Sequence, residues 1–212
     1  MPESIERILE AALTNRLFIG QILICTRNGS TVLSHRDDEG RVHLQKFSNP
    51  EDALEIAHYD DDGNYRPLKT APNLRHGWQL QLVDVHALRI AVDHFYPGRL
   101  AMFAAWKANR LTTTPLRATL DRQSGMYRIA AKISDQQLDP LIANFCRSDG
   151  GCLRTILWKR NAAGSVASTK LPPEKFDPAH DQTARGERTI PLLCQEACNL
   201  LVAECRKAVK RE

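Results

Sequence analysis

The chain has 212 residues, of which 42% are apolar and 25% are charged, and its net charge is only +4. These values are ordinary for a soluble globular protein with one large domain or two small ones. Residues 1–13 are rich in charge and lack the apolar core of a secretory signal. Because no apolar run approaches the roughly 18 residues of a membrane-spanning helix, we expect a cytoplasmic protein with no membrane partner.

The first half of the chain alternates between helical and strand patterns. Asn28-Gly29 stands between two apolar runs and is typical of a hairpin turn, because both residues tolerate positive φ. With a second turn at 37–40, the pattern predicts a three-stranded antiparallel meander over residues 17–47. The other elements expected here are helices at 4–13, 50–59, 84–95, 99–111 and 114–123, and one strand at 78–83.

The second half predicts fewer strands and a long connection. Residues 161–190 are rich in Ala, Gly, Ser, Thr and Pro without periodicity, which indicates an unusually long loop. The elements expected around it are strands at 126–133 and 153–160, and helices at 135–146 and from Pro191 to about residue 210. The whole pattern belongs to the α+β class: an N-terminal antiparallel meander with helices, then a mostly helical C-terminal part.

Two cysteine pairs lie in the last third of the chain. Cys194 and Cys198 are four residues apart on a predicted helix, which would place both thiols on one face, one turn apart. That arrangement suits two ligands of one metal centre better than a disulfide. Cys146 and Cys152 enclose Gly150-Gly151, whose backbone can curl closely around a ligand. In a reducing compartment, such grouped cysteines are more often ligands than disulfides.

The residues alone leave the kind of centre open. Neither pair has the C-x2-C spacing of common zinc or ferredoxin motifs. Four cysteines favour an iron–sulfur cluster, but a zinc site and a pair of ordinary turns without metal are also compatible with the spacing. The segments 147–160 and 191–212 carry net charges of +3 and +1, which equal the excess of the whole chain. These cations could offset an anionic thiolate centre or attract an anionic partner.

The remaining candidates have simpler interpretations. Cys205 would lie about two turns beyond Cys198, too far to share a small centre, and Cys25 is expected to be a small buried side chain in a strand. His35 and His43 could face each other across the second turn, but they have no third ligand. Trp158 is expected in the core, where it would shield the site from solvent. The chain has no nucleophile elbow, Walker loop or dinucleotide fingerprint.

A resemblance to a known family adds to these observations. The segments DDDGNYRPLKTAPNLRHGW, YPG, RQSGMYR, CRSDGGCLRTILW and LLCQEACNLLV resemble a bacterial family of 4Fe-4S cluster-binding domains. In that family the cluster domain follows a "stabilising" domain, at the C-terminal end of proteins related to CbiX-type sirohydrochlorin chelatases. The resemblance implies a stabilising domain over 1–125 and a cluster-binding domain over 126–212.

The resemblance also implies a cofactor and a setting. The cofactor would be a 4Fe-4S cluster, and its ligands would be Cys146, Cys152, Cys194 and Cys198. No chelatase module precedes the stabilising region in this sequence, so chelatase activity is not implied. We expect a redox or accessory protein linked to tetrapyrrole metabolism of the sirohydrochlorin or cobalamin type, with a chelatase-like or redox protein as partner.

The alternative is a structural metal staple, iron–sulfur or zinc, in a module that binds protein or nucleic acid; nucleic acid is the less favoured partner. The sequence leaves open whether the protein is an enzyme and what its oligomeric state is.

Overall fold

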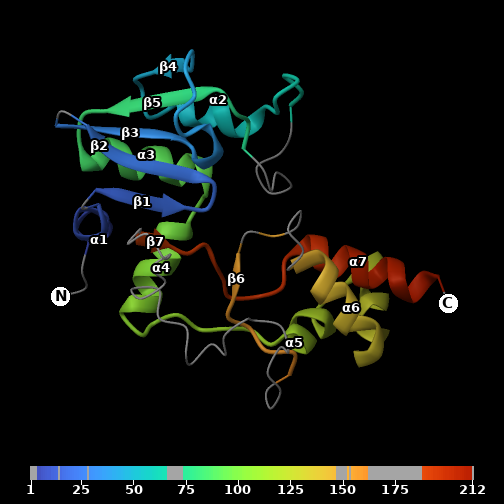
Figure 1. The fold of residues 1–212 in the computed structure, drawn as a ribbon. Helices are drawn as coiled ribbons and strands as arrows, with labels where there is room; N and C mark the ends of the chain where they lie inside the picture. Colours follow the sequence, from blue (N-terminus) through green and yellow to red (C-terminus); the bar gives the residue numbers. More distant parts are fainter. Residues whose placement is uncertain are drawn as a thin grey trace. The chain divides into compact units, whose positions relative to one another are not determined.

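The computed structural model describes residues 4–13, 15–27, 29–65, 74–146, 152, 154–161 and 188–211. Its internal contacts divide the chain into two compact units (Figure 1). Unit 1 consists of Met1–Arg110 and Asp177–Leu192, and unit 2 consists of Leu111–Phe176 and Leu193–Glu212. Among the described helices, none combines the length and the apolar character needed to cross a membrane.

Unit 1 is built on a mixed six-stranded sheet, in the strand order β4-β5-β3-β2-β1-β7. Its strands are β1 (Arg16–Ile19), β2 (Ile22–Arg27), β3 (Ser30–His35), β4 (Gln45–Phe47), β5 (Trp78–Leu82) and β7 (Arg188–Ile190). The pairs β1–β2, β2–β3 and β3–β5 are antiparallel, whereas the edge strands β4 and β7 pair in parallel. Apolar residues from neighbouring strands, such as Ile24, Leu33 and Leu80, are fully buried.

The predicted N-terminal meander is confirmed, but the strands that form it differ from those expected. The apolar run that we expected to form one strand turns at Gly20 and Gln21, so that β1, β2 and β3 form the meander. The stretch after the second turn contributes only the short strand β4. Strand β4 does not pair with β3, because β5 lies between them and pairs with both.

In the described part of unit 1, four α-helices lie at the expected positions. They are α1 (Ile5–Ala12), α2 (Asp52–His58), α3 (Val85–Phe95) and α4 (Arg99–Lys107). Two of these helices have side-chain caps at the expected starts: the side chains of Ser4 and Asp84 accept hydrogen bonds from the first turns of α1 and α3. Helices α2 and α3 lie side by side along the sheet (Figure 1) and contact β5.

Unit 2 is mostly helical, as expected, and has a small two-stranded sheet. Its helices are α5 (Leu116–Asp121), the 3-10 helix η3 (Gly125–Lys132), α6 (Asp135–Cys146) and α7 (Asn199–Lys210), and its strands are β6 (Thr155–Ile156) and β8 (Leu193–Cys194). Both units together confirm the α+β class.

The strand predicted at 126–133 is wrong, because this segment forms η3. A 3-10 turn places Ala130 and Ile133 in the core of unit 2, where both are almost fully buried. Helix α6 begins at the expected place. The Ser134 hydroxyl accepts the N–H of Gln137, and the Gln137 side chain accepts the N–H of Ser134, which is a reciprocal capping box. The helix includes Pro140 and ends at Cys146.

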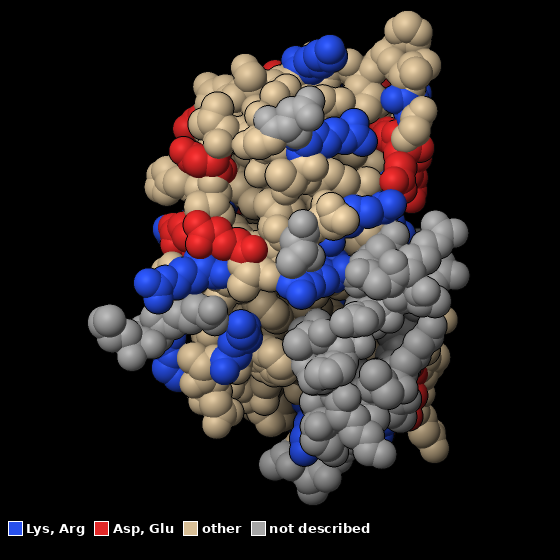
Figure 2. All heavy atoms as spheres, turned by 60° about the vertical axis from the view of Figure 1, so that its left-hand side comes forward, with Lys and Arg blue, Asp and Glu red and all other residues tan. Residues whose placement is uncertain are grey.

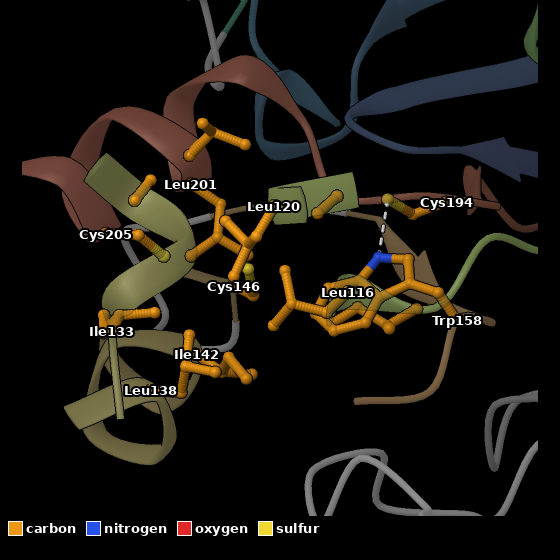
Figure 3. Packing of buried hydrophobic residues seen from close by; sticks show 14 residues of the cluster. Leu116, Leu120, Ile133, Leu138, Ile142, Cys146, Trp158, Cys194, Leu201 and Cys205 are labelled. Atoms are coloured by element: carbon orange, nitrogen blue, oxygen red, sulfur yellow. Dashed lines mark hydrogen bonds between the residues drawn. The ribbon is translucent and has the colours of Figure 1, made fainter. Parts of the chain in front are cut away.

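One hydrophobic core holds unit 2 together (Figure 3). Its buried members are Leu116, Leu120, Ala130, Ile133, Leu138, Ile142, Cys146, Ile156, Trp158, Cys194, Ala197, Leu201, Val202 and Cys205. Most of these residues come from α5, η3, α6, α7 and both short strands, and Ile133, Trp158 and Ala197 come from the connections between them. Since α5 supplies two fully buried leucines to this core, it belongs to unit 2. The units therefore divide after Arg110, whereas the boundary expected from the sequence lies at residue 125. Most of the predicted loop 161–190 lies outside the described residues.

Candidate metal centre

All four cysteines of the two pairs belong to unit 2, and they differ in exposure. Cys146 ends α6 and Cys194 lies in β8, and each side chain is buried with 8% of the residue exposed. Cys152 and Cys198 are half-buried. The set therefore reaches from the core of unit 2 to its surface.

The prediction that Cys194 and Cys198 share one helix is wrong. Cys194 is in an extended segment, and Cys198 is the N-cap residue of α7, with φ −80° and ψ 162°. The helix cannot begin at Pro191, because the backbone after it is held extended by partners in unit 2. Strand β8 pairs in parallel with β6. The Cys194 carbonyl accepts the N–H of Leu157 at 3.0 Å.

Cys194 is the cysteine whose surroundings are best defined. The indole Nε1–H of Trp158 donates to the Sγ of Cys194 at 3.4 Å (Figure 3). The Cys194 thiol in turn donates to the Glu196 carbonyl at 3.1 Å. Trp158 is 1% exposed, which confirms its predicted place in the core beside the cysteines. A buried N–H aimed at sulfur is the kind of donor that stabilises a thiolate.

Burial, a hydrogen bond and nearby charges all act on the pKa of the Cys194 thiol. Burial raises the pKa of the Cys194 thiol, whereas the hydrogen bond from Trp158 and the charge of Arg154 lower it. Cys152 and Cys198 raise the same pKa through charge repulsion. These two sulfurs are therefore close enough to Cys194 to interact electrostatically. Cys146 shares the hydrophobic core with Cys194, and Cys198 packs against that core.

The remaining two cysteines are placed differently. Cys205 is fully buried within α7, and burial raises the pKa of its thiol to about 11, so it stays protonated at neutral pH. Cys25 is half-buried in β2 of unit 1, where burial likewise raises its pKa. Among the described residues, neither thiol has the indole N–H donor and the charge contributions from other cysteines that are found around Cys194.

This donor set fits an iron–sulfur cluster. Such clusters are held by four thiolates, and hydrogen bonds to sulfur and the degree of solvent exposure adjust their potentials. Unit 2 supplies four cysteines, an indole N–H and the guanidinium of Arg154 beside Cys194. The apolar core on one side of the set would shield bound iron and sulfide from water.

Comparisons with known proteins identify both units. Residues 4–110 match the model of the DR2241 stabilising domain, and residues 108–207 match a 4Fe-4S iron–sulfur cluster binding domain. The chain belongs to the DR2241 stabilising-domain family. Its second half is a 4Fe-4S cluster-binding domain, so its cofactor is a 4Fe-4S cluster. The two family models meet at residues 108–110, where the first segment of unit 1 ends, and the second model also spans Asp177–Leu192, which belongs to unit 1.

A solved relative has the same fold. The crystal structure of DR2241 from Deinococcus radiodurans is 28% identical to this chain, with a TM-score of 0.71. The match covers 96% of this chain but only 41% of that chain. That relative is described as a multi-domain protein with structural similarity to chelatases and two additional novel domains. A comparison with curated proteins gives no match.

The structure also brings together residues that the sequence analysis missed. From the sequence, His35 and His43 could face each other across the second turn, but His43 lies in an exposed bend with φ 63°. His35 instead contacts His76, and their ring centroids are 4.1 Å apart. The contact follows from the strand order, because β5 pairs with β3 and begins just after His76. The spacing of 41 residues along the chain contains no signal for this contact.

Proposed function

We propose that Cys146, Cys152, Cys194 and Cys198 hold the 4Fe-4S cluster of this family member, and that the protein uses it for electron transfer. The ligand assignment is supported by the common location of these cysteines in the cluster-binding domain. It is also supported by the place of Cys146 and Cys194 in one hydrophobic core, against which Cys198 packs. A cluster bound there would supply one-electron redox chemistry.

The exposure of the four cysteines is the observation that carries the redox role. Electrons move efficiently only over short distances, so a redox centre must approach the protein surface. Cys146 and Cys194 face the core, whereas Cys152 and Cys198 are half-buried. A cluster bound by all four would have one shielded side and one side near solvent. A fully enclosed set would favour a structural role instead.

The proposed setting is an accessory redox protein for a tetrapyrrole-handling enzyme in the cytoplasm. This step rests on DR2241, which is similar to chelatases and shares both domains of this chain. The chain spans 41% of that relative. A chelatase-like partner would receive electrons at the side of unit 2 that carries Cys152 and Cys198.

A structural cluster is the second candidate, and one observation favours it. The four cysteines lie at the end of α6, before β6, in β8 and at the start of α7. A cluster bound by them would tie four segments together around the core. Binding to nucleic acid has less support, since such proteins gather Lys and Arg on one face. On the face in Figure 2, the described basic side chains are interspersed with acidic ones.

The test begins with anaerobic purification of the wild type, Cys198→Ala and Cys205→Ala. We expect about four irons and four sulfides per chain and a brown colour in the wild type and in Cys205→Ala. Cys198→Ala should lose most of the iron and the visible absorbance. Equal iron in both variants would contradict the ligand assignment.

Redox titration then separates the two roles. A redox protein should take up and release one electron reversibly, with its iron content and circular dichroism spectrum unchanged. A structural cluster should resist reduction until the fold is lost, and removal of iron should then unfold unit 2. That second result would overturn the electron-transfer proposal while leaving the ligands in place.

A further inference from the structure

Two histidines and a carboxylate meet at one end of the sheet in unit 1. His35 ends β3, Asp37 lies in the 3-10 helix η1 (Arg36–Asp38), and His76 lies two residues before the start of β5. One potential ligand atom from each residue lies within 4.8 Å of the other two. Within the described part of the chain, this is the only such group of three His, Cys, Asp or Glu side chains. It lies in unit 1, whereas the cluster cysteines all lie in unit 2.

His35 is the buried member of the group. The residue is 0% exposed, and its Nδ1 accepts the N–H of Asp37 at 3.2 Å. Its Nε2 has no hydrogen-bond partner among the described residues. Because Nδ1 accepts a hydrogen bond, the proton of the neutral ring lies on Nε2, and the lone pair that can bind a metal lies on Nδ1. Burial and the neighbouring His76 lower the pKa of the imidazole.

His76 is oriented in the way that is typical of a metal ligand. The Asp61 carboxylate accepts the N–H of the His76 backbone at 2.6 Å and lies 2.9 Å from its Nδ1. Because a carboxylate can only accept, Nδ1 carries the proton and Nε2 keeps its lone pair. A metal-binding histidine almost always donates its other N–H in this way.

The segment that carries His76 is also fixed in place. The N–H of Gly77 donates to the buried carboxylate of Asp38 at 2.5 Å. The indole of Trp78 donates to the Arg75 carbonyl at 2.7 Å. These contacts hold both sides of His76 against the end of β3, so the ring does not need to move far to share a ligand with His35.

Asp37 supplies the third donor from the solvent side. Its Oδ2 lies 3.8 Å from Nδ1 of His35, and its side chain is 62% exposed. A metal with ligand bonds of about 2.1 Å can bridge such a pair. Asp37, Asp38 and Asp61 outnumber the two nearby cations, Arg36 and Arg41, which contact Asp37 and Asp38. The local charge therefore favours an added cation.

We propose that His35, Asp37 and His76 form a second metal site, for a divalent transition-metal cation such as Zn²⁺. Two imidazoles and one carboxylate suit such cations and leave further coordination positions open. His76 is 39% exposed at its side chain and Asp37 is 62% exposed, so water or an exchangeable ligand can occupy those positions. On metal binding, the hydrogen bond from the Asp37 N–H to His35 Nδ1 is given up, and the lone pair of Nδ1 binds the metal instead. This site goes beyond the proposed redox function and does not depend on it.

The experiment titrates Zn²⁺ into the full chain with its cluster loaded, under anaerobic conditions, by calorimetry. We expect the wild type to bind one Zn²⁺ and its melting temperature to rise with Zn²⁺ concentration. His76→Gln and Asp37→Asn should each weaken binding by about tenfold or more, and Asp61→Asn should weaken it because the carboxylate that orients the His76 ring is lost. These exposed positions are chosen because substitution of the buried His35 could disturb the fold. His86→Gln, at an exposed histidine on α3, is the matched control and should bind like the wild type.

Two outcomes would overturn the proposal. One is the absence of Zn²⁺ binding by the wild type. The other is equal binding by the wild type, His76→Gln and Asp37→Asn, which would mark adventitious binding elsewhere. Visible absorbance recorded in the same titration shows whether Zn²⁺ displaces iron from the cysteines. If Zn²⁺ uptake parallels the loss of visible absorbance in every variant, Zn²⁺ is binding at the cysteines, which is a case of the second outcome.

Discussion

Trp158 donates its indole N–H to the Sγ of Cys194 across 3.4 Å, inside the hydrophobic core of unit 2. If Cys194 is a cluster ligand, this hydrogen bond stabilises the more negative, reduced state. Trp158→Phe should therefore lower the reduction potential. A hydrogen bond contributes about 1 kcal/mol, which limits the shift to the order of tens of millivolts for a one-electron couple. Redox titration followed by visible absorbance measures it.

The matched control for this change is Trp78→Phe. Trp78 is also fully buried, but its indole donates to the Arg75 carbonyl in unit 1, so the potential should stay unchanged. Iron must be quantified in both variants, because a partly occupied site would distort the titration. An unchanged potential in Trp158→Phe with full iron would mean that this N–H does not influence the cluster.

The start of α7 offers a paired test of the core. Leu201 is fully buried, whereas its neighbour Leu200 is 38% exposed. Leu201→Ala removes apolar side-chain volume from the core of unit 2 and should lower the free energy of unfolding by about 2–5 kcal/mol. Leu200→Ala should cost less than about 1 kcal/mol. Denaturant unfolding of the cluster-loaded proteins measures both, and similar losses would contradict the burial of Leu201.

Local sequence signals predicted the elements whose ends are determined by nearby residues. The caps at Ser4 and Asp84 fixed the starts of α1 and α3, and the capping box at Ser134 fixed the start of α6. The helices of unit 1 have clear apolar faces, so their positions followed from periodicity.

The other features depend on partners that are distant in the chain. Strand β5 separates β4 from β3, and β7 returns from the second half of the chain to pair with β1. Cys194 is extended because β8 pairs with β6, although its segment has a helical pattern. The two cysteine pairs could be singled out from sequence, since their residue type limits their chemistry. The contact between His35 and His76 could not, because it needs the strand order.

In the turn between β1 and β2, the backbone at Gly20 lies very close to the side chains of Tyr96 and Leu192. Gly20 has φ +58°, and a Cβ there would lie 2.6 Å from the Tyr96 hydroxyl and 2.8 Å from Leu192. Gly20→Ala must therefore combine left-handed strain of about 1 kcal/mol with overpacking of about 1–3 kcal/mol. Gly29→Ala is the control, because Gly29 has φ +78° but no atom within 4 Å of the added Cβ. Denaturant midpoints should fall much further for Gly20→Ala, and equal shifts would exclude the steric contact.

Tyr96 links α3 to this turn and gives unit 1 a predictable response to alkaline pH. Its hydroxyl accepts the N–H of Gln21 at 2.9 Å, and burial raises its pKa to about 12 from the ordinary value of 10.0. Between these values the unfolded chain loses the proton that the folded protein keeps. The contribution of Tyr96 is therefore complete below about pH 10 and is lost as the pH rises towards 12.

Tyr96→Phe isolates this contribution. At neutral pH the variant should be less stable by about 1 kcal/mol, because the hydrogen bond to Gln21 is removed. Above about pH 10 its stability should fall less steeply than that of the wild type, so the difference between the two proteins narrows. Urea unfolding across this range measures the difference, and a tyrosinate absorbance titration should lack the most alkaline step in the variant. A constant difference in stability at every pH would show that the pKa of Tyr96 is the same in the folded and unfolded states.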